Sequence, residues 1–452
     1  MASVRHELLD LIENPDEAYN QPTAELAVRQ LQAADELFQQ QRGRIAVLRR
    51  RAQEAGIESI GSVDDLVPLL FSHTAYKSYP QSFVDQGRWD RMLQWLQTLS
   101  ADDVTGVDVE GVTDVDDWID RLEDAGHLLV VTSGTSGKCS FLNHSRADRE
   151  RKKRHFLHTV AYPHARPDGN RPFFWLGPLT GANSAVEAAN LNAAHWARPG
   201  AVHALIDEPL RTADISRTAI LRRKLADGSA TPQEIAEAES SSATKAAQGQ
   251  EALAKFTDLL LDHRHQPIFL SGVWAQHMMI MERARERGIP DGDFHPDSVV
   301  NAGGGIKGIP LPADYREQVA AFYGDVVRPG HYGMSELAQL MPRCEAGRYH
   351  RAAGLIILVL DDTGDKALGP EDAGPDGLVR GRFAFLDLAH EGRWGGIITG
   401  DAVTADFSGQ CACGRSGPTL LDDIRRFAQP GEDDKIGCAG TIDAYIRGAI
   451  GA

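Results

Sequence analysis

The sequence is poor in cysteine, with five cysteines in 452 residues. So few thiols in a chain of this length do not make a disulfide framework, and their positions carry more information than their number. The sequence has no run of about 18 apolar residues, which argues against a membrane-spanning helix. Residues 1–10 carry charges and lack the apolar core of a secretory signal, so we expect a cytoplasmic protein.

Basic residues are in the minority as well. Lys and Arg total 47 against 64 Asp and Glu, which gives a formal net charge of −17. Nucleic-acid-binding surfaces are basic, so this balance argues against a nucleic-acid partner. The content of 42% hydrophobic and 25% charged residues is ordinary for a globular protein, and the length allows two or three domains or subdomains.

Apolar residues recur at helical spacing from residue 1 to about residue 60. Leu8, Leu11, Ile12 and Leu26 are separated by Ala, Gln, Glu and Arg, which favour helix. We therefore expect a helical N-terminal arm that packs on a larger domain.

Further along the chain, short apolar runs alternate with long helical stretches. Residues 171–178 and 267–272 have the apolar character of buried strands. Residues 209–262 have a helical pattern, interrupted where Thr231 precedes Pro232 as a helix N-cap followed by proline at the first helical position. The alternation predicts an α/β fold built in layers.

The run from Arg146 to Arg154 is dense in basic residues. We interpret it as the start of a helix whose charged face is solvated.

Residues 127–138 form the most informative stretch of the sequence. An apolar, β-branched run predicts a buried strand, and small hydroxylated residues with two glycines follow it, ending at Lys138. Glycines let the backbone approach an anion closely, and hydroxyl groups and a lysine add donors and charge, so we predict a polyphosphate-binding loop. The stretch is not a Walker A loop, because that pattern needs glycine where Thr132 stands. The alternative is a Gly/Ser turn that binds no ligand.

This stretch resembles the phosphate-loop motif of the adenylate-forming enzymes, the superfamily of acyl-CoA synthetases, adenylation domains and luciferases. The usual motif ends Gly-Lys-Pro-Lys, and this chain has Cys139 and Ser140 in the last two positions. Residues 71–80 resemble a segment of phenylacetate-CoA ligase-like proteins and of LuxE-type acyl-protein synthetases. A surface loop with aromatic anchors explains that segment equally well.

Three later stretches follow in the order expected for the same superfamily. Residues 299–305 are a strand that runs into three glycines, and the corresponding segment of the superfamily borders the adenine. Residues 328–336 match a Tyr-Gly-x-Thr-Glu motif with Ser335 in place of the threonine. Residues 395–401 resemble the segment whose aspartate accepts hydrogen bonds from the ribose hydroxyls.

The resemblance, which covers roughly residues 70 to 445, implies roles for single residues. Lys138, Ser335 and Glu336 would be catalytic, with Ser335 contacting phosphate and Glu336 holding Mg²⁺, an ion that favours carboxylate oxygens and substrate phosphates. Arg426, or alternatively Arg425, would contact the ribose. The implied nucleotide-binding residues are Thr132, Ser133, Gly134, Thr135, Ser136, Gly137, Gly303, Gly304, Gly305, Tyr332, Asp401 and Arg426.

The cysteines supply a second candidate site. Cys344 and His350 lie in one short stretch, and Cys411 and Cys413 lie in another. Three thiolates and one imidazole complete a tetrahedral shell, which is typical of structural zinc. The Cys-x-Cys spacing is tighter than usual, but both stretches resemble zinc-bearing segments of some phenylacetate-CoA ligase-like proteins. The alternative is that these cysteines pack as small hydrophobic residues.

We therefore predict three parts of the chain. A helical arm would occupy residues 1–65, the large domain of the adenylate-forming fold residues 66–430, and a hinge-like segment residues 431–452. The large domain would contain layered α/β subdomains and a small β-rich subdomain. In the superfamily a lid domain with an adenylation lysine follows the hinge. We expect this domain to be absent here, so that Lys138, Lys307, Lys435 or a lysine of a partner would replace that lysine.

The resemblance implies activation of a carboxylic acid with ATP and Mg²⁺ as an acyl-adenylate, with release of pyrophosphate. A thiol or amine would then accept the acyl group, and CoA, a carrier protein or a partner subunit are the candidate acceptors. One alternative is the same fold activating an oxyanion that is not a carboxylate. Another is a non-catalytic nucleotide-binding subunit.

Overall fold

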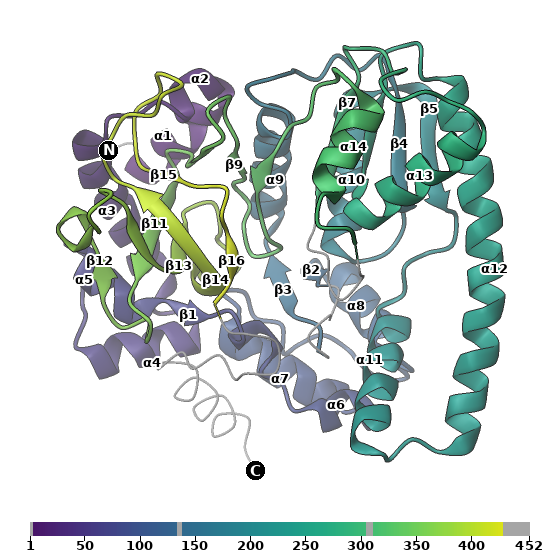
Figure 1. Ribbon diagram of the computed structural model, residues 1–452. Helices are drawn as coiled ribbons and strands as arrows, with labels where there is room; N and C mark the ends of the chain where they lie inside the picture. The colour runs from purple at the N-terminus through teal and green to yellow at the C-terminus, as the bar shows by residue number, and fades with distance from the viewer. Residues whose placement is uncertain (1–2, 133–137, 304–310, 428–452) are drawn as a thin grey trace. The chain divides into compact units, whose positions relative to one another are not determined.

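The computed structural model describes residues 3–132, 138–303 and 311–427, which fall into two compact units (Figure 1). In the described ranges, the first unit contains residues 3–131, 140–159 and 331–427, and the second unit contains the remaining residues. None of the helices in these ranges has both the length and the apolar character needed to cross a membrane.

The N-terminal part of the first unit is helical, as the spacing of its apolar residues predicted. Ser3 caps the first helix, where its side chain accepts a hydrogen bond from the His6 N–H. Leu8, Leu26 and Leu37 are buried on the inner faces of these helices. The α-helices and 3₁₀ helices (η) described in this unit are α1 (Val4–Asp10), η1 (Leu11–Glu13), α2 (Pro15–Ala18), α3 (Thr23–Gln41), α4 (Ala46–Ala55), α5 (Val63–Leu66), η2 (Val67–Leu69), η3 (Ala75–Lys77), α6 (Gln81–Asp85), α7 (Trp89–Leu99), α8 (Val115–Asp124), α9 (Arg146–Thr159) and η4 (Pro370–Asp372).

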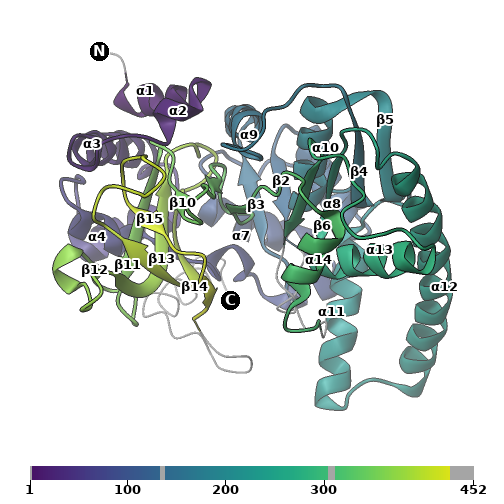
Figure 2. The ribbon, with the colours of Figure 1, turned by 45° about the horizontal axis from the view of Figure 1, so that its top comes forward.

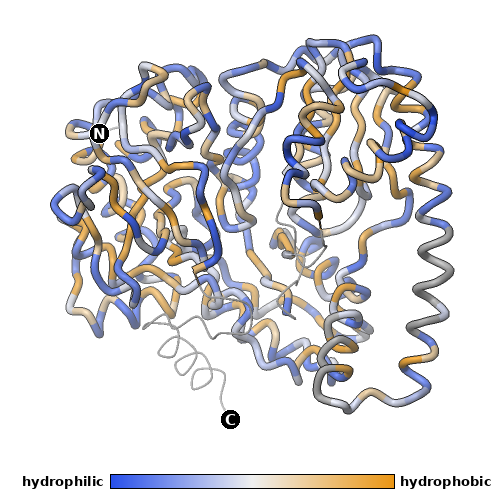
Figure 3. The backbone as a smooth tube through the Cα atoms, viewed as in Figure 1, coloured by the Kyte–Doolittle hydropathy of each residue, from blue (hydrophilic) through white to orange (hydrophobic). Residues whose placement is uncertain are grey.

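The core of the first unit is a sheet with the strand order β10-β15-β14-β13-β11-β12, in which β1 and β16 also pair with β14. Its strand β11 is hydrophobic throughout (Figure 3), and every residue of β11 is buried. A strand covered on both faces has this continuous apolar pattern. The strands are β1 (Phe71–Ser72), β10 (Tyr349–His350), β11 (Leu355–Leu360), β12 (Ala367–Leu368), β13 (Val379–Asp387), β14 (Gly396–Asp406), β15 (Thr419–Leu420) and β16 (Arg425–Arg426).

Two short antiparallel pairs complete the first unit. Strand β2 (Leu128–Val131) pairs with β3 (Phe141–His144), and β8 (His331–Tyr332) pairs with β9 (Met341–Pro342). Strand β2 confirms the buried strand predicted before the glycine loop.

Helix α9 begins at Arg146, as the basic run predicted. The expected solvated face is wrong for part of the helix, because Asp148 is 0% and Lys152 is 3% exposed. Asp148 accepts hydrogen bonds from the Glu391 and Gly392 N–H groups in the linker between β13 and β14, a contact that the local sequence does not indicate.

The second unit contains a parallel sheet with the strand order β5-β4-β6-β7. Helices connect its strands, since neighbouring parallel strands need a crossover connection and a helix usually provides it. Apolar side chains of the strands and helices, among them Phe174, Leu260, Leu270 and Phe322, form one core. The elements are β4 (Arg171–Pro178), α10 (Ser184–Trp196), β5 (Ala197–Ile206), α11 (Thr212–Asp227), α12 (Pro232–Asp262), β6 (Phe269–Val273), α13 (Trp274–Glu286), β7 (Val299–Gly303) and α14 (Tyr315–Tyr323).

Helices α11 and α12 form an adjacent pair (Figures 1 and 2). Thr231 caps α12 as predicted, since its hydroxyl accepts from the Glu234 N–H at 3.2 Å and the Glu234 carboxylate accepts from the Thr231 N–H at 2.9 Å. Pro232 occupies the first turn, where its missing N–H costs no hydrogen bond. The predicted α/β class and the predicted helix break are both confirmed.

A histidine in the core of the second unit makes this unit sensitive to acid. His277 is buried beside the Tyr323 hydroxyl at 2.9 Å, and burial lowers its pKa to about 4. Below pH ~6.5 the unfolded chain binds a proton that the folded chain does not, so stability falls as the pH drops from ~6.5 to ~4. We expect His277 to contribute about 3 kcal/mol to this loss.

Urea unfolding midpoints at several pH values, measured for the wild type and for His277→Gln, test this expectation. The stability of the variant relative to the wild type should rise as the pH falls. A difference that is the same at pH 7 and pH 4.5 would contradict it.

Candidate functional site

Asp401 is the centre of a polar cluster in the first unit. Strands β14 and β16 pair antiparallel with Asp401 opposite Arg426, which puts the two side chains on one face of the sheet. Arg426 Nη1 donates to Asp401 Oδ1 at 3.0 Å, and the Tyr332 hydroxyl donates to Asp401 Oδ2 at 2.8 Å. The structure therefore brings together three residues that the sequence placed in separate motifs.

Tyr332 is packed through its ring and hydrogen-bonded through its hydroxyl in this cluster. Its ring packs edge-on against Phe383, with the ring centroids 5.2 Å apart. Burial, followed by the charge of Asp401, raises the pKa of Tyr332 well above its ordinary value, so the hydroxyl stays protonated and can donate. At the next residue, Gly333, a Cβ would lie 2.6 Å from Leu340 Cδ2, so any larger residue would displace the Leu340 side chain.

Glu336 belongs to the same unit, and its side chain is almost completely enclosed. It is 6% exposed, and burial raises its pKa. The Asp401 carboxylate raises this pKa further, while the cations of Arg393 and Lys77 lower it. A bound cation would stabilise the charged form of a carboxylate that burial disfavours. Ser335, which precedes it, is half-buried.

The segment from residue 71 to residue 80 contributes groups that the sequence analysis left unassigned. Strand β1 pairs in parallel with β14, and the His73 N–H donates to the Ile398 carbonyl at 2.9 Å. This register puts the His73 ring against Gly400. The two are so close that a Cβ added to Gly400 would lie 3.3 Å from His73 Cε1. The resemblance singled out this segment, but only the parallel pairing with β14 shows that it lies beside Asp401.

The other predicted nucleotide-binding residues belong to the second unit. Strand β7 ends at Gly303, as predicted, and Thr132 and Lys138 are half-buried. The remaining predicted residues of this group lie outside the described residues. So do two of the three lysines proposed to replace the lid lysine, and the hinge-like segment. These are Ser133, Gly134, Thr135, Ser136, Gly137, Gly304, Gly305, Lys307, Lys435 and residues 431–452.

The four candidate zinc ligands lie close together in the first unit. One ligand atom from each of Cys344, His350, Cys411 and Cys413 lies within 4.8 Å of the others. The sulfurs of Cys344 and Cys411 are 3.8 Å apart, and Cys413 Sγ is 3.5 Å from His350 Nε2. A tetrahedral ion with Zn–S bonds of about 2.3 Å separates two sulfurs by about 3.8 Å. The donor set and its spacing therefore fit a zinc ion.

Two matching turns present the cysteines. Each turn begins at a cysteine whose N–H donates to an arginine carbonyl four residues later, and the glycine before that arginine donates back to the cysteine carbonyl. The glycines, Gly347 and Gly414, have φ values of +72° and +88°, which few other residues adopt. The pattern Cys-x-x-Gly-Arg occurs at Cys344 and again at Cys411, so the sequence itself carries a signal for these two turns. Because the turn at Cys411 contains both cysteines of the tight Cys-x-Cys pair, that spacing is compatible with a single site.

The fold is similar to those of solved CoA ligases. One is an open conformation of 2-hydroxyisobutyryl-CoA ligase in complex with 2-HIB-AMP and CoA, with a TM-score of 0.54 and 13% identity over 91% of this chain and 71% of that chain. The same ligase in its thioesterification state gives a TM-score of 0.55 at 13% identity, over 91% and 70% of the two chains. No protein-family model and no curated protein matches the sequence. The chain therefore has the fold of these CoA ligases, which is the fold that the order of its four motifs predicted.

Proposed function

We propose that this protein activates a carboxylic acid with ATP. A carboxylate oxygen of the acid attacks the α-phosphorus, the bond from that phosphorus to the bridging oxygen breaks, and pyrophosphate leaves with the electron pair. The observation that carries this proposal is the cluster of Tyr332, Asp401 and Arg426, with the buried Glu336 in the same unit of an adenylate-forming fold. A thiol or amine then takes the acyl group, and CoA is the favoured acceptor because the similar ligases are named as complexes with CoA and an acyl-AMP.

Each residue of the cluster has a role that suits its chemistry. Asp401 and Arg426 contact the ribose, and Tyr332 stacks on the adenine. Glu336 holds Mg²⁺, which neutralises charge on the phosphates. The phosphate loop with Lys138, together with Ser335, contacts the phosphates. Catalysis rests on positioning and on electrostatic stabilisation of the transition state.

The four-ligand cluster of Cys344, His350, Cys411 and Cys413 holds a structural Zn²⁺ in this proposal. Four protein ligands leave no coordination position for water, which is the mark of a structural site. The ion would join the turn at Cys344 to the turn at Cys411, 67 residues further along the chain.

An ATP–pyrophosphate exchange assay over a panel of carboxylic acids tests the proposed reaction. The wild type should exchange label with at least one acid, and hydroxylamine should trap its acyl-adenylate as a hydroxamate. An exchange reaction that yields no hydroxamate would indicate a different oxyanion, and ATP binding without exchange would indicate a non-catalytic subunit.

Lys138→Ala is the companion variant for this assay. We expect at least about a 100-fold loss of exchange, the usual effect of removing a donor to transition-state charge. Lys255→Ala is a suitable control, because Lys255 is an exposed lysine of the second unit that pairs with Glu251. Equal exchange by the wild type and Lys138→Ala would count against the proposed phosphate contact.

A further inference from the structure

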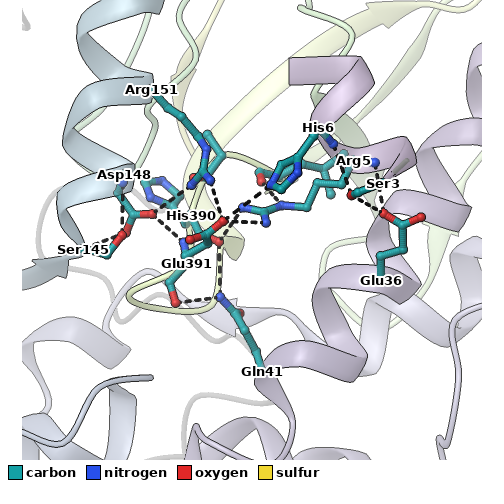
Figure 4. Close-up of polar contacts among 12 residues, drawn as sticks. Ser3, Arg5, His6, Glu36, Gln41, Ser145, Asp148, Arg151, His390 and Glu391 are labelled. Atoms are coloured by element: carbon teal, nitrogen blue, oxygen red, sulfur yellow. Dashed lines mark hydrogen bonds and ion pairs between the residues drawn. The ribbon is translucent and has the colours of Figure 1, made fainter. Parts of the chain in front are cut away.

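The linker between β13 and β14, residues 388–395, is held by buried side chains that the proposed function leaves unexplained (Figure 4). These side chains come from the N-terminal helices and from α9, far away in the sequence. All of the residues concerned belong to the first unit.

The N-terminal helices bind the carbonyl groups of the linker. Gln41 Nε2 donates to the carbonyls of His390 at 3.2 Å and of Arg393 at 3.1 Å. Arg5 Nε donates to the Leu388 carbonyl at 2.6 Å. Gln41 and Arg5 are both buried, so these bonds would be costly to lose.

Helix α9 binds the opposite side of the same linker. The Asp148 carboxylate accepts from the Glu391 N–H at 2.6 Å and from the Gly392 N–H at 2.9 Å. Gly392 packs so tightly here that a Cβ would lie 2.6 Å from Ser145 N. Arg151 donates to the Ala389 carbonyl at 3.1 Å and forms an ion pair with Glu391.

The group of His144, Asp148 and His390 in this network has donor types that could hold a metal ion. The surroundings argue against one. Asp148 already accepts from backbone N–H groups, and Arg393 Nη2 lies 2.8 Å from His390 Nε2. Burial and the nearby cations, Arg393 above all, lower the pKa of both histidines, so the network already contains the positive charge that a metal would add.

The linker in turn holds the backbone at Glu336. Arg393 Nη2 donates to the Glu336 carbonyl at 2.7 Å, and His390 Nε2 lies 3.1 Å from the same oxygen. Asp387, the residue before the linker, accepts from the Ala338 N–H at 2.7 Å. The main chain is therefore fixed at Glu336 and again two residues later.

We propose that the β13–β14 linker is the scaffold that positions the Glu336 carboxylate, with Arg393 as its principal positioning residue. The inference rests on the proposed role of Glu336 toward Mg²⁺. A metal carboxylate must be held to within about 0.5 Å of its productive geometry, which side-chain packing on a mobile loop would not achieve. The N-terminal helices and α9 thus act on the site through the linker, without touching the nucleotide.

Amide hydrogen exchange measured by mass spectrometry tests the scaffold without any need for activity. Arg393→Gln and Arg151→Gln should each speed exchange severalfold in the segment that contains Glu336 and Ala338. Arg151 is partly exposed, so replacing it should disturb the fold less than replacing Arg393. The Arg151 variant therefore still tests the inference if the Arg393 variant does not fold. Lys153→Gln, on the same helix but paired with Glu150 on the surface, should leave the segment unchanged. Unchanged exchange in both arginine variants would overturn the inference.

A Mg²⁺ titration of pyrophosphate exchange adds the catalytic readout. Arg393→Gln should raise the half-saturating Mg²⁺ concentration by about tenfold, the scale seen when a group that orients a metal ligand is removed. The KM for the acid should change far less, and Arg393→Lys should restore part of the Mg²⁺ response. A KM change for the acid without a Mg²⁺ shift would overturn the positioning role. A wild type that is inactive with every acid, but whose arginine variants show faster amide exchange, would instead overturn the proposed function and leave the scaffold standing.

Discussion

Replacing Cys411 with serine is expected to release one zinc ion per chain and to destabilise the first unit. Cys411 lies 3.8 Å from Cys344 within the four-ligand cluster, and a hydroxyl is a poor replacement for a thiolate. Binding energy of a structural zinc is folding energy, on the order of 10 kcal/mol in zinc-finger peptides, so we expect the melting temperature to fall by roughly 10 °C or more.

Elemental analysis and thermal unfolding of the purified protein measure both effects. Cys139→Ser is the matched control, because Cys139 is a buried thiol outside the cluster and its loss should leave the zinc content unchanged. Treatment of the wild type with a strong chelator should reproduce the destabilisation seen in Cys411→Ser. A wild type that is stable and free of metal would show that these cysteines are packing residues.

Replacing Glu336 with glutamine is expected to abolish most of the activity while the fold is retained. The amide has almost the same shape but carries no charge, so it offers Mg²⁺ a much weaker ligand. We expect pyrophosphate exchange to fall by about 100- to 1,000-fold, the usual effect of losing one electrostatic contact in the transition state. Burial of a neutral amide costs less than burial of a carboxylate, so the melting temperature should stay the same or rise.

Exchange rates at several Mg²⁺ concentrations, together with thermal unfolding, separate the two effects. Glu7→Gln removes an exposed carboxylate of the same unit, paired with Arg29, and should leave the rate unchanged. If Glu336→Gln retained wild-type exchange at low Mg²⁺, Glu336 would not be the magnesium ligand.

Local signals in the sequence were sufficient for much of the secondary structure. The break between α11 and α12 follows from Thr231 and Pro232, because a capping side chain and a proline at the first helical position act over only a few residues. The buried strand β2 and the N-terminal helices follow from apolar spacing in the same way. The fold class then follows from the alternation of these elements.

The motifs also selected residues that the structure brings together. Tyr332, Asp401 and Arg426 lie together, and so do the four candidate zinc ligands. The sequence supplied their chemistry, through donor types and motif order. It did not supply their geometry, since the Tyr332–Asp401 contact spans 69 residues and depends on the pairing of the strands.

Only the tertiary structure showed what the charged residues outside the motifs do. The basic run at residues 146–154 has the composition of a solvated helix, yet Asp148 and Lys152 are buried, and Asp148 binds the β13–β14 linker. Gln41 binds a carbonyl 352 residues away, and Arg393 binds the Glu336 carbonyl 57 residues earlier in the chain. Such bonds leave no periodicity or spacing in the sequence, because they form between backbone groups and side chains that come together only when the chain packs.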